Sequence, residues 1–99
     1  MKQHFAVIVQ RTSKWDNSTP PEQQPGFPDH LAYMGGLEKS GAIALAGLMT
    51  STNDVLFVFL AESEDEVRDL LGKDPWQREG KVCIARIEQL ALRIGNIKI

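Results

Sequence analysis

The residue best suited to acid–base chemistry in this 99-residue chain is His30, one of two histidines. It follows Pro28 and Asp29, and a proline followed by an acidic residue is typical of the first turn of a helix. The positive end of the helix dipole disfavours an imidazolium, so a neutral ring that can accept a proton is expected there. A lone histidine in this position is also commonly a surface or capping residue, and the residue type alone leaves both interpretations open.

Four other side chains can contact a substrate, and each also has a structural interpretation. Arg11 ends a strand-like run, where its guanidinium can bind an anion or remain solvated. Tyr33 follows His30 by three residues and so shares its helix face, as a neighbouring phenol or as a core residue. Asp74 precedes a proline, which is also an ordinary turn signal. Trp76 can stack on a ligand or simply pack.

The sequence provides no basis for a metal or a cofactor. The histidines are not paired at i and i+4, and no cysteine cluster accompanies them, so no metal site is predicted. The single cysteine, Cys83, stands between two apolar residues and is expected to be a packed, inert thiol. Dinucleotide, P-loop and nucleophile-elbow motifs are lacking, which removes support for nicotinamide, nucleotide and α/β-hydrolase chemistry.

The elements that must position these residues begin with a strand at residues 4–10. Residues 11–26 break the periodicity and form a long polar loop, and loops of about this length are usually functional or disordered. Trp15 in that loop is expected to anchor it on the core or to close over a ligand. Residues 28–40 form a helix, and the pair Gly35 and Gly36 inside it indicates a closely approaching backbone or a tolerated weak point.

Two strands at residues 42–49 and 55–61 follow and make a hairpin. Ser63 and Glu66 form a capping box that begins a second helix, which ends at Gly72 or Pro75. A fourth strand covers residues 81–90, with Val82, Ile84 and Arg86 on one face and Cys83, Ala85 and Ile87 on the other. The tail at 92–99 can add a short strand.

This β-α-β-β-α-β order predicts an α+β, ferredoxin-like fold with an antiparallel sheet, in a single domain covering residues 1–99. Two helices can cover only one face of the sheet, yet the first strand is apolar on both: Phe5, Val7 and Val9 on one, Ala6 and Ile8 on the other. We therefore expect the second face to pack on another copy, giving a homodimer or a higher oligomer. No RNP-type motif marks the sheet as an RNA-binding surface.

The composition and charge of the chain also limit the classes of partner that we expect. The net charge is −2 and the pI is near 5.6, so a nucleic-acid partner is not expected. The longest apolar runs are far shorter than the roughly 20 residues of a membrane helix, and from the residues before the first strand no signal peptide is expected. One cysteine is compatible with a reducing compartment. The expected setting is the cytoplasm, with a small-molecule ligand and no membrane partner.

Three segments together resemble the YCII-related family: the run at 28–34 that contains His30, the strand at 41–47 ending in Ala46-Gly47, and Asp74-Pro75-Trp76. The resemblance covers nearly the whole chain. It implies a dimeric α/β barrel, related in fold to muconolactone isomerase and small monooxygenases, with His30 and Asp74 paired at a pocket. Leu48 stands where the family often has proline, so the pocket wall there departs from the family pattern.

These considerations predict a small cofactor-independent isomerase or lyase, in which His30 and Asp74 transfer a proton on a carbonyl or phenolic compound. Arg11, Tyr33 and Trp76 are the candidate substrate contacts. The alternative is a non-catalytic dimeric module that binds a small ligand or assists a partner. A cavity with His30 and Asp74 within hydrogen-bonding distance favours the enzyme, whereas a filled cavity with His30 facing solvent favours the module.

Overall fold

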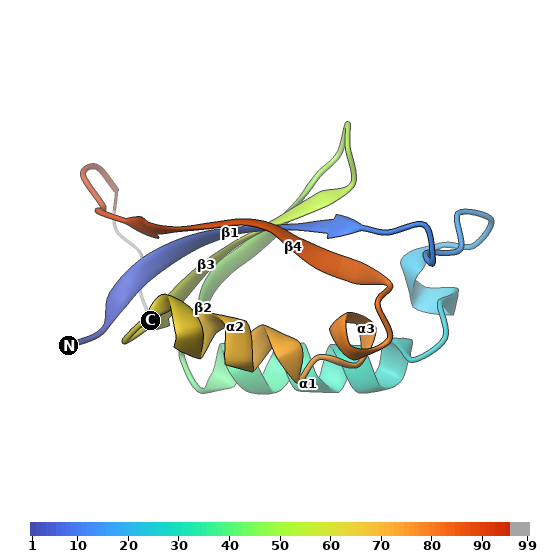
Figure 1. Cartoon of the computed structure of the whole chain (residues 1–99), viewed down its shortest axis with the longest axis horizontal. Helices are drawn as coiled ribbons and strands as arrows, with labels where there is room; N and C mark the ends of the chain where they lie inside the picture. Colours follow the sequence, from blue (N-terminus) through green and yellow to red (C-terminus); the bar gives the residue numbers. More distant parts are fainter. Residues whose placement is uncertain (96–99) are drawn as a thin grey trace.

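Four strands form one antiparallel sheet in the order β2-β3-β1-β4 (Figure 1). They are β1 (Gln3–Arg11), β2 (Ile43–Met49), β3 (Asp54–Ala61) and β4 (Val82–Leu90). The structure, a computed structural model, describes residues 1–95. The connections give the β-α-β-β-α-β order, which confirms the predicted ferredoxin-like topology.

Three α-helices lie on the same side of this sheet, below it in the view of Figure 1. They are α1 (Phe27–Lys39), α2 (Glu64–Gly72) and the single turn α3 (Pro75–Arg78), and a short 3-10 turn, η1 (Pro21–Gln23), interrupts the long loop. The helix α3 was not expected from the sequence. Its N-cap is Asp74, whose side chain accepts a hydrogen bond from the Trp76 backbone N–H.

The hydrophobic core lies between the helices and the near face of the sheet. The predicted alternation in β1 is confirmed, because Phe5, Val7 and Val9 are all buried on this face. β3 adds Phe57 and Phe59, and the helices cover them with Leu37, Val67 and Leu71.

The opposite side of the sheet, which we call the open face, carries no helix in residues 1–95. Its central residues are apolar and come from paired positions of β1 and β3: Ala6, Ile8, Leu56, Val58 and Leu60. Val58 is only 6% exposed, and the others are partly buried. The apolar second face predicted from β1 therefore exists and extends across β3.

A β-bulge in β4 overturns part of the predicted strand pattern. Ile8 pairs with Arg86 and Val9 with Ile84, so Ala85 has no partner in β1. Beyond the bulge the two faces exchange. Ile87 therefore packs against the core, and Arg86 belongs to the open face, where its guanidinium donates to Glu88 Oε1 at 2.6 Å.

Local signals at the helix ends are largely as the sequence indicates. Ser63 caps α2 and accepts from the Glu66 N–H at 3.1 Å, but the Glu66 carboxylate accepts from the Glu62 N–H, one residue before the predicted position. Gly41 ends α1 at φ 83°, a left-handed conformation that favours glycine. A Cβ at Gly35 or Gly36 would meet nothing within 4 Å, so no backbone of the described chain approaches this pair.

Two further expectations need correction. Cys83 is exposed rather than packed. Residues 92–95 form no strand, and the remainder of the predicted tail strand, 96–99, lies outside the described residues. None of the helices in residues 1–95 combines the length and the apolar character needed to cross a membrane.

Candidate functional site

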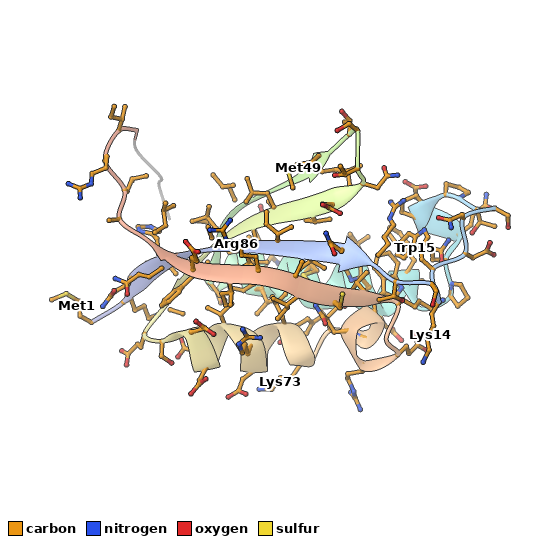
Figure 2. All side chains as sticks on the ribbon, turned by 45° about the horizontal axis from the view of Figure 1, so that its top comes forward. Met1, Lys14, Trp15, Met49, Lys73 and Arg86 are labelled. Carbon is orange, nitrogen blue, oxygen red and sulfur yellow. The ribbon has the colours of Figure 1, made fainter. Side chains whose placement is uncertain are left out.

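The long loop after β1 is held in place by one buried glutamine. Gln24 is 2% exposed. Its Oε1 accepts from the Asp16 N–H at 3.2 Å, and its Nε2 donates to the Asp16 carbonyl at 2.6 Å and to the Thr19 hydroxyl at 2.7 Å. These bonds fix the loop that carries Trp15. In Figure 2 Trp15 lies at the end of the molecule away from Met1.

His30 and Asp74 contact each other next to this loop. His30 lies near the start of α1, where its backbone N–H donates to the Gly26 carbonyl. Its Nδ1 lies 2.7 Å from Asp74 Oδ1, and the His30 side chain is 18% exposed. Asp74 is 1% exposed, and it connects α2 to α3. The pairing that the family resemblance implies is therefore present in the fold.

Trp76 fixes the His30 ring from another direction. The imidazole stacks on the indole with centroids 3.7 Å apart and planes 15° apart. The Trp76 Nε1 donates to the Pro25 carbonyl at 2.9 Å, which ties the indole to the loop. Asp74 thus holds one edge of the imidazole, and Trp76 covers one of its faces.

Trp15 and Arg11 continue the row of contacts that begins with His30 and Trp76. The Trp15 ring meets Trp76 edge-on, with centroids 4.9 Å apart. The Arg11 guanidinium carbon lies 4.3 Å from the centroid of the Trp15 ring. We call the series Arg11, Trp15, Trp76 and His30 the aromatic stack. It links the end of β1, the loop, α3 and α1.

The aromatic stack forms part of the wall of a cavity of about 300 Å³, at the low end of the size range of small-molecule sites. The cavity lies between the end of the sheet and the helices. Its polar lining residues are Arg11, His30, Asn53, Asp74 and Gln77, and its apolar ones include Val9, Met34, Leu48, Val55, Phe57 and Leu71. Trp15 is buried, as expected of a residue that anchors the loop, and it also lines the cavity; that it closes over a ligand stays a prediction.

Sequence patterns did not single out Gln77, which is the next residue after Trp76 in α3. Its Nε2 is buried and has no hydrogen-bond partner within residues 1–95. Buried amide donors are almost always paired in folded proteins. The pattern of the sequence contains no signal for this residue, because only its placement at the cavity distinguishes it from an ordinary surface glutamine.

Tyr33 occupies a different position from the other candidate contacts. Its hydroxyl donates to the Leu70 carbonyl at 2.7 Å and so joins α1 to α2, and the residue is not part of the cavity wall. Burial, and then the negative charge of Asp74, raise the pKa of the phenol above its usual value. The structure thus brings Arg11, His30, Asp74 and Trp76 together and leaves Tyr33 between the helices.

Comparison with known proteins supports the fold but not a family. No protein-family model matches the chain, and no curated protein matches it. A solved structure described as the structural-genomics protein YJCS is similar with a TM-score of 0.50 over 94% of this chain and 100% of that one. The identity is 11%, so the likeness shows a shared small α/β fold and nothing about activity.

Proposed function

We propose that the protein is a small enzyme, an isomerase or lyase without a cofactor, that transfers a proton on a carbonyl or phenolic compound bound beside His30. The observation that carries this proposal is the 2.7 Å contact between His30 Nδ1 and the buried Asp74 carboxylate at the wall of an apolar cavity. Such a pair, positioned in a cavity, is a typical arrangement for acid–base catalysis.

The chemistry follows from the roles of the two nitrogens. A carboxylate can only accept hydrogen bonds, so Nδ1 carries a proton and donates a hydrogen bond to Asp74. Nε2 is then the basic atom, and it removes a proton from a carbon next to a carbonyl or from a phenol and returns it elsewhere. The charge gained by the ring lies between a carboxylate and the face of Trp76, which both stabilise a cation.

Solvent exchange tests this proposal even though the natural substrate is unidentified. The protein is incubated in D₂O with a panel of cyclic ketones, lactones and phenols, and the loss of each exchangeable C–H signal is followed by proton NMR. We expect His30→Gln and Asp74→Asn to slow the exchange by roughly 10² or more, the usual contribution of general acid–base catalysis. Lys73→Met is the matched control, because this exposed residue adjoins Asp74 but does not line the cavity (Figure 2).

Exchange at equal rates in the wild type and in His30→Gln would remove the proposed role of His30. Compounds that raise the thermal stability of the protein but undergo no exchange would favour the non-catalytic binding module instead, because a ligand that binds only the native state stabilises it.

We further propose that the open face pairs with that of a second copy. A face made of Ile8, Leu56 and Val58 is apolar and contiguous, and face-to-face packing would remove it from water. Light scattering after size exclusion should give a dimer for the wild type and a monomer for Ile8→Glu. Leu31→Glu is the control, since Leu31 is 57% exposed on α1, away from the open face. A monomeric wild type at micromolar concentration would contradict this proposal.

We also propose that the protein belongs to the YCII-related family and that it works in the cytoplasm. The sheet order and the His30–Asp74 contact are compatible with the family resemblance of the sequence. The single exposed thiol of Cys83 is compatible with a reducing compartment.

A further inference from the structure

We infer that the cavity binds planar carboxylic acids, and that Gln77 and Arg11 together hold the carboxylate. The inference builds on the proposed function, because it gives the class of substrate for the same site. It assigns to Gln77 a role in specificity.

Arg11 has the properties of an anion-binding residue. Within residues 1–95 no carboxylate oxygen lies within 4.0 Å of its guanidinium, although the chain contains thirteen acidic residues. The guanidinium is instead held over the Trp15 ring at 4.3 Å. A contact with one aromatic ring cannot engage all five N–H groups of a guanidinium, so N–H groups remain available to a carboxylate.

Gln77 supplies the second donor. The residue lines the cavity, and its Nε2 is buried and, within the described residues, without a partner. A buried N–H without a partner destabilises the folded state, and a ligand that accepts this hydrogen bond would remove the penalty. Within residues 1–95, the fold thus places an unsatisfied donor and a cation without a carboxylate partner on the wall of one cavity.

The balance of charge in the wall favours an anion over a cation or a neutral polar compound. Asp74 is the single acidic residue among the lining residues, and its Oδ1 already accepts from His30. The remaining wall is dominated by aromatic and aliphatic side chains, including both tryptophans of the chain. A flat apolar body with one acidic group matches these surfaces.

The order of the aromatic stack sets the direction in which such a compound lies. Arg11 and His30 are the two ends, and the indole rings of Trp15 and Trp76 stand between them. A carboxylate held at the Arg11 end leaves the rest of the molecule along the indoles toward His30. The carboxylate therefore serves to bind the compound, and the reacting atom is at the opposite end of the compound, next to His30.

Unreactive acids and their amides separate this inference from the proposed reaction. We would titrate the protein with the planar acids benzoate, 4-methylbenzoate and furan-2-carboxylate, each against its primary amide, and follow the fluorescence of Trp15 and Trp76. The two rings are the only tryptophans in the chain and both line the cavity. We expect at least one acid to bind about 10- to 100-fold more tightly than its amide, as hydrogen bonds to a charged group do.

Variants then locate the carboxylate. Arg11→Met, Gln77→Leu and Gln77→Glu should each reduce the acid's advantage over its amide by roughly tenfold or more, most of all Gln77→Glu, which adds a repelling charge. Arg78→Met is the control, since this exposed cation neighbours Gln77 in α3 but does not line the cavity.

Equal binding of every acid and its amide, or no binding of any acid up to its solubility limit, would overturn the inference. So would an unchanged acid preference in both Gln77 variants. His30→Gln alters the cavity wall and so changes the affinity for both benzoate and its amide, but the ratio of acid affinity to amide affinity should stay within about threefold of the wild-type ratio. Loss of proton exchange with a retained acid preference would therefore implicate the reaction alone, and the reverse result would implicate the carboxylate contacts alone.

Discussion

Removing the Asp74 carboxylate should destabilise the fold far more when the side chain is truncated than when only its charge is removed. Asp74 Oδ1 accepts two hydrogen bonds, from His30 Nδ1 at 2.7 Å and from the Trp76 N–H at 3.4 Å. Asp74→Ala loses both, whereas Asp74→Asn keeps an acceptor oxygen, and asparagine caps helices as well as aspartate does.

The expected magnitudes follow from these distances. A short hydrogen bond that involves a charged group contributes about 1.5–3 kcal/mol to the free energy of unfolding. The 3.4 Å cap is long, so its contribution belongs near the lower end of the usual range, about 0.5–1 kcal/mol. Asp74→Ala should therefore lower the free energy of unfolding by about 2–4 kcal/mol, and Asp74→Asn by about 1 kcal/mol, because only the assistance of the charge is lost.

Urea unfolding at pH 7, followed by tryptophan fluorescence and far-ultraviolet circular dichroism, measures both values. A double-mutant cycle with His30→Phe, which keeps a flat ring on Trp76, isolates the energy of the pair. Additivity within about 0.5 kcal/mol, or equal losses for alanine and asparagine at position 74, would refute the reasoning.

Two further predictions concern the helices. Gly35→Ala should raise the free energy of unfolding by about 0.5–1 kcal/mol, because the added methyl group meets nothing within 4 Å. Gly41→Ala should lower the free energy of unfolding by about 1–2 kcal/mol, because Gly41 has a φ of 83°. Thermal unfolding compares the two variants, and a lower melting temperature for Gly35→Ala than for the wild type would contradict the first prediction. The chain has one tyrosine, so alkaline titration of phenolate absorbance reports Tyr33 alone, and the raised pKa predicts a midpoint above 10.0 that Asp74→Asn lowers. Because the folded state then holds this proton more tightly than the unfolded chain, stability should fall as the pH rises beyond 10.0, and a midpoint at or below that value would exclude the raised pKa.

The fold was predictable because its signals are local. Side-chain alternation defines β1, Ser63 marks the start of α2, and Gly41 marks the end of α1. Each signal depends on residues within a few positions along the chain, so it can be recognised without the tertiary structure.

The bulge at Ala85 was not predictable in the same way. A bulge is defined by pairing between strands, and the prediction continued a period of two through residues 82–87 without that information. The prediction that Arg86 shares a face with Ile84 was wrong for this reason, and so was the placement of Ile87.

In the candidate site, too, the features that depend on tertiary structure could not be predicted from the sequence. His30 and Asp74 are 44 residues apart, and a resemblance to a family, not their spacing, indicated their pairing. The roles of Gln24 and Gln77 escaped prediction, because the burial of an uncharged amide is decided by tertiary structure. Tyr33 has the helical spacing of a site residue, but the turn of α1 directs its hydroxyl to Leu70.

The aromatic stack has a consequence for how the protein can change over evolutionary time. Since Trp15 belongs to the loop and contacts Trp76, which in turn carries the His30 ring, a shift of the loop is transmitted to the imidazole through two rigid rings. Substitutions among the polar residues that hold the loop can therefore tilt the imidazole by small steps. The loop is a place where the orientation of this ring can be adjusted while the histidine and the aspartate stay the same.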